Sequence, residues 1–186
     1  MPEVKILVKG YTSADKPGKK ERSCSTITLV KDGRSVIVVD PGTLASQEVL
    51  VKALKKEGLS PADVNVVFLT HSHIDHFASV GMFPKATIVE YYGAWKNDAV
   101  KDRPSNLTKN IQILETSGHS YTGLTLLVKT SIGKVAVCGD VFWKENYPVV
   151  DKYADNSKKL KESRRKLLRV ADYIVPGHAG MFKVIK

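Results

Sequence analysis

Residues 70–76 read Thr-His-Ser-His-Ile-Asp-His and form the densest group of chemically active side chains in the sequence. In an extended backbone alternate side chains point to the same side, so His71 and His73 are expected to face one point. If the chain then turns into a helix near Asp75, the side chains of Asp75 and His76 can face a second point close by. Imidazole and carboxylate groups are the usual ligands of zinc, and of iron or manganese in similar sites. This segment therefore offers four ligands, two for each of two neighbouring metal ions.

Three further candidate ligands, His119, Asp140 and His178, each follow a predicted strand and stand directly behind a glycine. A glycine at that place lets the backbone turn sharply. The chain contains five histidines, and every one lies in residues 70–76 or directly behind one of these glycines. Histidines scattered by chance would not cluster in this way, so a metal site is favoured over a purely structural role.

Apolar patterns predict the strands that position these ligands. Asp32-Gly33 between two apolar runs predicts a β-hairpin, and the second run ends in the turn residues Asp40-Pro41-Gly42. Residues 93–110 are polar and irregular, and we expect a long loop there that borders a site. The expected strands cover residues 4–8, 25–30, 35–39, 65–69, 86–91, 111–115, 124–129, 134–138 and 173–175.

Two helices are predicted outside these strands. The first has Ser46 as a candidate cap and ends at Gly58, and the second covers residues 155–171. The buried side of the second helix is expected to carry Leu160, Leu167, Leu168 and Ala171. Strands in sets, with helices between and after them, indicate an α/β protein in which two sheets pack together with helices outside.

The length of 186 residues suits a single compact domain over residues 1–186. No apolar run approaches the roughly 20 residues that span a bilayer, and the N-terminus lacks the pattern of a signal peptide. We therefore expect a cytoplasmic protein without a membrane partner. In that compartment Cys24 and Cys138 are expected to be free, buried thiols.

The formal net charge of +10 favours anionic partners such as phosphates, carboxylates or nucleic acid. The alternative is a lysine-rich solvated surface, as in many thermophile proteins. That alternative is favoured, because the basic residues are mostly spread along the chain. The clearest cluster, in residues 158–166, is typical of the solvent-facing side of a helix.

Five segments together resemble the metallo-β-lactamase superfamily, and they occur in the family's order over nearly the whole chain. The resemblance is closest to the short, single-domain branch that includes metallo-β-lactamase domain-containing protein 1. The matching segments are Val39-Asp40-Pro41-Gly42, residues 70–76, Gly118-His119-Ser120, Cys138-Gly139-Asp140 and Pro176-Gly177-His178.

The resemblance implies a four-layer αββα sandwich with two divalent metal ions along one edge, zinc in the first place and iron or manganese as alternatives. It implies that His71, His73 and His119 hold the first ion. The second ion would be held by Asp75, His76 and His178, with Asp140 bridging the two. Asp40 would orient ligands by hydrogen bonds without binding metal.

Two departures from the family pattern stand out. Family members commonly have glycine two residues after the last histidine of the long motif, where this chain has Ala78. This mild change puts local packing in question and leaves metal binding untouched. One subclass of true β-lactamases has cysteine where Asp140 stands, so Asp140 argues against that subclass. Cys138 lies within a strand and is expected in the core.

The expected chemistry is hydrolysis, in which two ions roughly 3.5–4 Å apart share a water, lower its pKa and create a bridging hydroxide that attacks the substrate. Asp75 is expected to orient the nucleophile or relay a proton, which makes Asp75 and Asp140 the catalytic residues. The leading substrate class is phosphoesters, namely di- or triesters or nucleic acid. It rests on the net charge and on the branch, whose named member is nuclease-like.

Other activities stay open. Thioester or lactone hydrolysis fits relatives similar to glyoxalase II or to lactonases. A persulfide oxygenase uses the same motif with one iron. A nucleic-acid-binding scaffold without catalysis would be indicated if candidate metal ligands of the family motif were replaced, and none of them is replaced in this sequence. A small anionic or ester substrate is expected, and a homo-oligomer is compatible with the sequence. Candidate substrate contacts are Trp95, Trp143 and Lys144, with ordinary packing as the equally weighted alternative.

Overall fold

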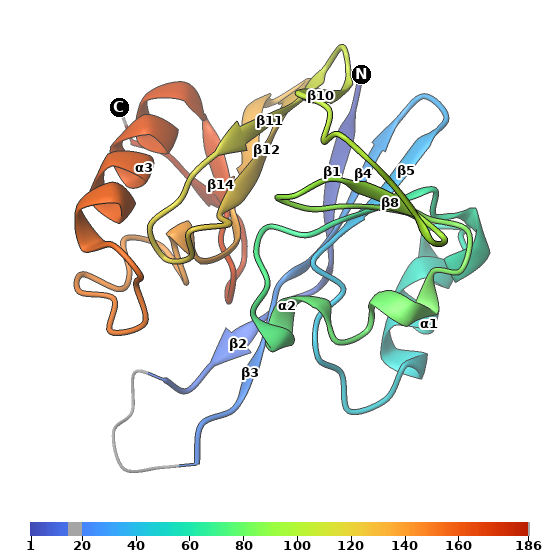
Figure 1. Cartoon of the computed structure of the whole chain (residues 1–186), viewed down its shortest axis with the longest axis horizontal. Helices are drawn as coiled ribbons and strands as arrows, with labels where there is room; N and C mark the ends of the chain where they lie inside the picture. Colours follow the sequence, from blue (N-terminus) through green and yellow to red (C-terminus); the bar gives the residue numbers. More distant parts are fainter. Residues whose placement is uncertain (15–19, 186) are drawn as a thin grey trace.

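The computed structural model describes residues 1–14 and 20–185, and in it two β-sheets pack face to face with helices on both outer faces (Figure 1). In the first sheet the strand order is β1-β4-β5-β6-β7-β8-β9, and in the second it is β10-β11-β12-β13-β14-β15. This arrangement confirms the expected pair of sheets between outer helices.

The first sheet is built from the N-terminal half of the chain. Its parallel centre, β5-β6-β7, is formed by short apolar runs that are buried, as parallel strands covered on both faces require. The predicted hairpin is confirmed, because β4 and β5 pair antiparallel across Asp32 and Gly33. The strands are β1 (Glu3–Val8), β4 (Ile27–Asp32), β5 (Ser35–Val39), β6 (Val66–Phe68), β7 (Thr87–Val89), β8 (Ala94–Lys96) and β9 (Ala99–Lys101).

The helix α1 (Glu48–Lys56) covers the outer face of the first sheet. Leu50 and Leu54 are fully buried against Val38 and Val67 of the sheet. The Ser46 hydroxyl accepts a hydrogen bond from the Glu48 backbone N–H at 3.3 Å, and Gly58 follows the helix with a positive φ of 72°. Three single turns complete this half: η1 (Pro61–Asp63), α2 (Ile74–Phe77) and η2 (Val80–Met82).

The second sheet comes from the C-terminal half, and α3 (Ser157–Val170) lies across its outer face (Figure 1). Asn156 caps this helix by accepting a hydrogen bond from the Lys159 backbone N–H. Leu160, Leu167 and Ala171 are buried as predicted, and Leu168 is partly buried. The strands are β10 (Asn106–Thr108), β11 (Ile111–Glu115), β12 (Leu124–Thr130), β13 (Gly133–Val137), β14 (Tyr173–Val175) and β15 (Phe182–Lys183).

The main core lies between the two sheets. Ile37, Val39 and Phe68 of the first sheet pack in one cluster with Leu126 and Val137 of the second. These side chains alternate along their strands with residues that face the helices, so each strand serves two layers of packing. The rigid sandwich fixes where the loops at its edge begin, and the candidate ligands lie on those loops.

The prediction of a long loop over residues 93–110 is wrong. The segment forms β8 and β9, which pair antiparallel, followed by β10 at the edge of the second sheet. Asn97 in the turn between β8 and β9 has a positive φ of 55°. The side chains of β9 are exposed, so the sequence lacks the apolar alternation that marks a half-buried strand.

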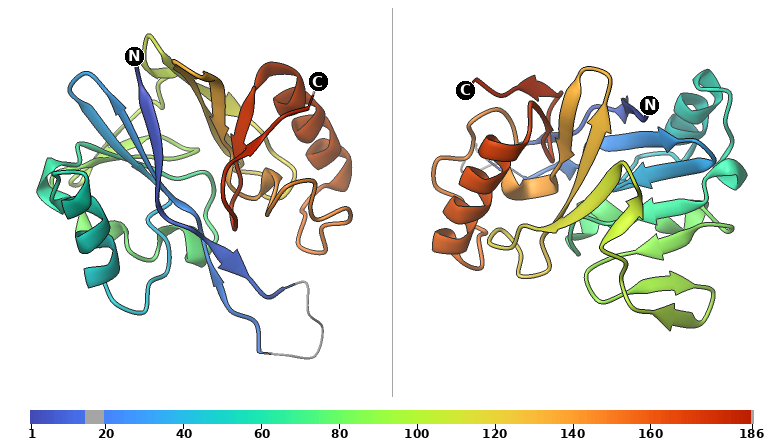
Figure 2. Two further views of the ribbon diagram at one scale, coloured as in Figure 1. Left: turned by 180° about the vertical axis from the view of Figure 1, so that it is seen from behind. Right: turned by 90° about the horizontal axis from the view of Figure 1, so that it is seen from above.

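A small hairpin of β2 (Tyr11–Thr12) and β3 (Ser23–Cys24) extends away from the sandwich (Figure 2). Its base is held tightly, because a Cβ on Gly10 would collide with the backbone of Cys24, Ser25 and Thr26. Within the part of the chain that the structure describes, no helix has the length and apolar character needed to cross a membrane.

Candidate metal centre

The predicted turn from extended chain into helix occurs within the histidine motif. The strand β6 ends at Phe68, His73 has an extended backbone, and α2 starts at Ile74. His71 and His73 therefore precede the helix, while Asp75 and His76 lie in its single turn. His76 is completely buried.

The other three candidate ligands approach from the second sheet. His119 follows β11, Asp140 lies in the turn η3 (Gly139–Val141) after β13, and His178 follows β14. All three side chains are at least 92% buried. The sandwich thus brings together all seven predicted ligands at one edge, in two adjoining groups.

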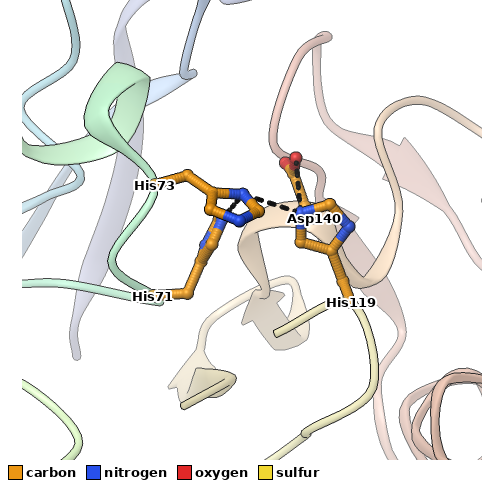
Figure 3. A group of neighbouring side chains, drawn as sticks. All are labelled: His71, His73, His119 and Asp140. Carbon is orange, nitrogen blue, oxygen red and sulfur yellow. Dashed lines mark hydrogen bonds and ion pairs between the residues drawn. The ribbon is translucent and has the colours of Figure 1, made fainter. Parts of the chain in front are cut away.

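The first group consists of His71, His73, His119 and Asp140 (Figure 3). Nδ1 of His73 lies 3.0 Å from Nε2 of His71 and 3.0 Å from Nε2 of His119. Nε2 of His119 lies 3.4 Å from Oδ2 of Asp140. The ligand atoms of this group lie within 4.8 Å of one another, so they surround a space of the size that one ion needs.

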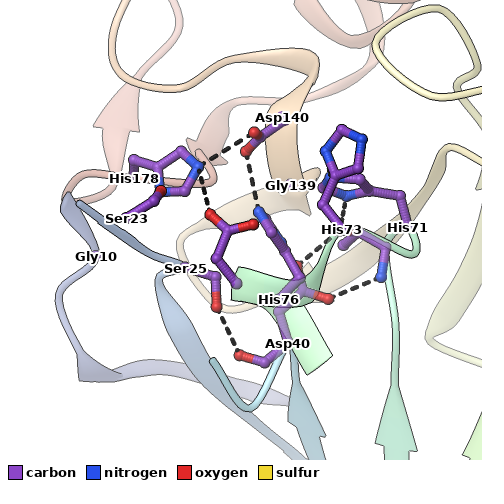
Figure 4. Close-up of polar contacts among 12 residues, drawn as sticks. Gly10, Ser23, Ser25, Asp40, His71, His73, His76, Gly139, Asp140 and His178 are labelled. Carbon is purple, nitrogen blue, oxygen red and sulfur yellow. Dashed lines mark hydrogen bonds and ion pairs between the residues drawn. The ribbon is translucent and has the colours of Figure 1, made fainter. Parts of the chain in front are cut away.

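The second group consists of Asp75, His76 and His178. Figure 4 shows Asp140 beside His76 and His178 of this group. Oδ1 of Asp140 lies 3.3 Å from Nε2 of His76, and Oδ2 lies 3.1 Å from Nε2 of His178. Oδ2 of Asp75 lies 3.7 Å from Nε2 of His178. Asp140 is therefore in contact with histidines of both groups.

Asp40 lies behind the centre and holds its ligands in place. Its Oδ2 atom accepts hydrogen bonds from Nδ1 of His76 at 2.8 Å and from the Thr70 hydroxyl at 2.7 Å. Its Oδ1 atom accepts the Thr70 backbone N–H at 2.8 Å. The Thr70 hydroxyl in turn lies 3.1 Å from Nδ1 of His71. With Nδ1 engaged, His76 turns Nε2 towards the centre.

A second buried carboxylate, Asp151, supports His119 and was not predicted from the sequence. Its Oδ2 atom lies 2.7 Å from Nδ1 of His119. His178 is fixed differently, since its Nδ1 lies 3.0 Å from the carbonyl oxygen of Cys24. Asp151 stands in an irregular loop 32 residues after His119, and no local spacing pattern marks that pairing.

Two buried atoms at the centre indicate that it fits a metal ion. Nε2 of His76 and Oδ1 of Asp140 are inaccessible to water, and neither makes a hydrogen bond although the two atoms lie 3.3 Å apart. Buried polar atoms in folded proteins nearly always have a partner. A divalent cation between an imidazole nitrogen and a carboxylate oxygen supplies that partner, and both atom types are usual zinc ligands.

The titration behaviour of the site suits ligation. Burial, followed by the neighbouring histidines, holds the pKa of His71 well below its ordinary value, so this ring is neutral. Burial alone would raise the pKa of Asp140, but His178 and His76 outweigh it and hold that pKa well below the ordinary value. For His76, burial is outweighed by Asp140 and Asp40, which raise its pKa. Metal binding would displace the proton on His76.

Two glycines are required by close packing at the centre. A Cβ on Gly177 would overlap Oδ1 of Asp140, and a Cβ on Gly139 would overlap the Thr70 hydroxyl. Gly139 also has a positive φ of 51°, in agreement with the sharp turn expected before Asp140. Glycine is required at position 177 because a Cβ would overlap its neighbours, and not because the backbone has a positive φ.

A cavity of about 460 Å³ opens from the centre. Trp143 lines this cavity, with its ring 6.4 Å from that of His119 and 6.5 Å from that of His178. The other two candidate substrate contacts do not line it. The Trp95 indole N–H donates to Glu90 at 2.8 Å, and the Lys144 ammonium lies over the Tyr147 ring at 4.3 Å. The lining residues are Thr12, Ala14, Glu21, Ser23, Thr43, His73, Ile74, Asp75, His119, Asp140, Trp143, Tyr153 and His178.

Both cysteines are free and buried, as predicted. Cys138 has its Sγ 3.6 Å from the carbonyl oxygens of Gly139 and Val175, and it packs in the cluster beneath α3. Cys24 lies at the base of the β2–β3 hairpin. Neither thiol belongs to the two groups of candidate ligands.

Comparisons with known proteins agree with this geometry. Residues 24–105 match the family model described as the metallo-beta-lactamase superfamily. Metallo-beta-lactamase domain-containing protein 1 of Xenopus laevis is 33% identical over 98% of this chain and 82% of the relative. The human protein of the same name is 27% identical over 98% of this chain and 82% of its own length.

Solved structures show the same fold. A putative metallo-beta-lactamase from Thermotoga maritima aligns with a TM-score of 0.78 and 25% identity, covering 98% of this chain and 99% of the other. An N-acyl homoserine lactone hydrolase with product at its catalytic metal centre aligns with a TM-score of 0.70 and 18% identity. That alignment covers 95% of this chain and 92% of the other, and at this identity it shows the fold alone.

Proposed function

This chain is a hydrolase of the metallo-beta-lactamase superfamily, and we propose that it uses two divalent metal ions to cleave a small ester. The predicted family resemblance and the predicted αββα fold are confirmed by these comparisons. The metal ligands and the substrate class belong to the proposal, and the following contacts support them.

The position of Asp140 between the two groups is the main observation that supports two metal ions. Its oxygens lie 3.4 Å from Nε2 of His119 in the first group and 3.1 Å from Nε2 of His178 in the second. A carboxylate so placed is suited to bridge two cations. A persulfide oxygenase with one iron would use only one group, whereas here Asp75, His76 and His178 form a second group whose ligand atoms lie close enough to hold an ion. We propose zinc as the first choice, with iron or manganese as alternatives.

The bound ions would supply a nucleophile from water near neutral pH and polarise the oxygen of the substrate. His71, His73 and His119 would hold the first ion, and Asp75, His76 and His178 the second. Asp75 lines the cavity and its side chain keeps 20% of its surface exposed. We propose that this carboxylate orients the attacking water and accepts its proton. The Trp143 ring, which is 4% exposed, would exclude bulk water from one side of the reacting bond.

The lining of the cavity favours a carboxylic ester, such as a lactone or thioester. Among the described residues no lysine or arginine lines it, and the charged side chains other than histidine are Glu21, Asp75 and Asp140. A phosphodiester carries a charge that Lys and Arg side chains usually neutralise. The expected phosphoesterase activity is therefore our second candidate. The net charge of +10 and the resemblance to metallo-beta-lactamase domain-containing protein 1 favour it, but that charge includes an exposed basic cluster on α3.

Metal analysis and a substrate panel test the proposal. We expect two ions per chain and turnover of lactones or thioesters after loading with zinc. Phosphomono-, di- and triesters and β-lactams complete the panel, and Asp140→Ala and His119→Ala should abolish turnover. One iron per chain with oxygen uptake would support the persulfide oxygenase instead. Salt-sensitive nucleic-acid binding without turnover would support a non-catalytic scaffold.

A further inference from the structure

Two segments that are distant in the sequence are joined at the cavity by hydrogen bonds to Glu21. The Tyr153 hydroxyl donates to Oε2 of Glu21 at 2.5 Å, and the Lys152 ammonium donates to Oε1 at 2.9 Å. Glu21 lies just before β3, while Lys152 and Tyr153 precede α3. Because both Glu21 and Tyr153 line the cavity, their contact joins two of its walls.

The hairpin wall is fixed at the end near the metal centre. Tyr11 pairs with Cys24 and Thr12 with Ser23 in the β2–β3 ladder. The Cys24 carbonyl oxygen lies 3.0 Å from Nδ1 of His178, and the Ser23 hydroxyl lies 3.4 Å from the same atom. This wall therefore starts beside a candidate ligand and continues to Glu21, which precedes Ser23 on the same segment and also lines the cavity.

The opposite wall is fixed to another ligand. Asp151 contacts His119 through Oδ2 and accepts the Tyr153 backbone N–H through Oδ1 at 2.9 Å. The Tyr153 ring lies 6.0 Å from the Trp143 ring at an interplanar angle of 30°. Both walls are thus held at the metal centre and joined to each other at Glu21.

The space between the walls is mainly apolar. The Trp143 and Tyr153 rings and the side chains of Ile74 and Ala14 face the cavity. Its volume of about 460 Å³ lies in the range of pockets for small ligands. His119, Asp140 and His178 are at least 92% buried, whereas Tyr153 is 43% exposed and the Glu21 side chain is 47% exposed, so the Glu21–Tyr153 contact lies at the outer end of the cavity. An apolar group attached to the scissile ester would fit between the two ends.

We propose that Glu21 and Tyr153 are specificity-determining residues, whose contact closes the outer end of the cavity and limits the length of the substrate's acyl group. This inference rests on the proposed ester hydrolysis. Each methylene that enters the apolar space strengthens binding about fourfold, the factor that burial of one CH₂ supplies. An acyl chain that is long enough to reach the Glu21–Tyr153 contact gains no further affinity from additional methylenes.

Binding of straight-chain carboxylates, from acetate to decanoate, tests the limit without any turnover. The zinc-loaded protein carries Trp95→Phe, so that Trp143 in the cavity wall is the remaining fluorophore. We expect affinity to rise with chain length and then to stop rising. In Tyr153→Phe, which keeps the ring, and in Glu21→Ala, the rise should continue to longer chains. The same series of p-nitrophenyl esters gives kcat/KM against chain length.

Tyr121→Phe is the matched control. The Tyr121 hydroxyl is paired with that of Tyr92 at 3.0 Å, and neither residue lines this cavity, so its length limit should equal that of wild type. An unchanged limit in Tyr153→Phe and Glu21→Ala, or no length dependence in wild type, would overturn the inference. If no ester is cleaved although carboxylate binding shows the shifted limit, the proposed hydrolysis fails and the length limit stands.

Discussion

Nδ1 of His119 lies 2.7 Å from Oδ2 of Asp151, and both side chains are buried. A carboxylate in this position fixes the histidine tautomer, so that Nδ1 donates to Asp151 and Nε2 faces the metal. Asp151 is therefore expected to strengthen metal binding without touching the ion.

Asp151→Asn should lower zinc affinity by about 10- to 100-fold, the usual effect of changing such a partner. A titration of zinc against a chelating dye measures the change. Asp155→Asn is the control in the same loop, because its carboxylate accepts the Tyr121 backbone N–H and makes no contact with the His119 ring. Equal zinc affinities for both variants and wild type would show that Asp151 has no role in ligation.

Removal of metal should lower the thermal stability of the protein. Without an ion, Nε2 of His76 and Oδ1 of Asp140 are buried and make no hydrogen bond, although they face each other at 3.3 Å. Zinc at 100 times its dissociation constant would stabilise the fold by about 2.7 kcal/mol, which corresponds to roughly 5–10 °C in Tm. Melting curves with a chelator and with added zinc measure this shift. Asp140→Ala should show a much smaller shift, and an equal shift would place the binding elsewhere.

The candidate ligands could be predicted because their signals are local. His71, His73, Asp75 and His76 follow one another in a single motif, and the other three each stand directly behind a strand and a glycine. Strand ends on a packed sandwich converge on an edge, so the motif and the strand pattern together place these side chains. The helix α3 was predictable from the apolar side formed by Leu160, Leu167, Leu168 and Ala171, and the β4–β5 hairpin from its turn residues Asp32 and Gly33.

The contacts around the ligands could not be predicted, because they join distant segments through tertiary packing. Glu21 and Tyr153 are 132 residues apart in the sequence, and neither belongs to a motif. The exposed hairpin of β8 and β9 was missed because its residues lack alternating hydrophobicity. This hairpin also holds Trp95 away from the cavity. The indole N–H of Trp95 donates to Glu90 there.

Neither cysteine should react with a thiol reagent in the folded protein. Cys24 is 2% exposed and Cys138 is 1% exposed, and burial raises the pKa of both thiols. The thiolate is the reactive form, so a buried thiol with a raised pKa is inert. A DTNB assay should find no reactive thiol in the native state and two after denaturation. A thiol released by a chelator alone would indicate a metal-bound cysteine.

Gly177→Ala should weaken metal binding although no ligand is replaced. The added Cβ would overlap Oδ1 of Asp140, and the backbone there is fixed because the Gly177 N–H donates to the Phe142 carbonyl at 2.9 Å. The Asp140 carboxylate must therefore move. We expect zinc affinity to fall on the order of 100-fold, the upper end of the effects seen around metal ligands. The overpacking should cost about 1–3 kcal/mol of stability.

Gly180→Ala provides the matched control for this substitution. A Cβ on Gly180 would meet only the Lys9 Cε at 3.9 Å, which is ordinary contact, and its φ is not in the left-handed region. Zinc titration and thermal melting of the two variants separate the steric effect at Asp140 from a general effect of replacing glycine. If Gly177→Ala binds zinc as tightly as Gly180→Ala, the position of the Asp140 carboxylate does not depend on the bare backbone at Gly177. Asp140 would then have room to move while still holding both ions.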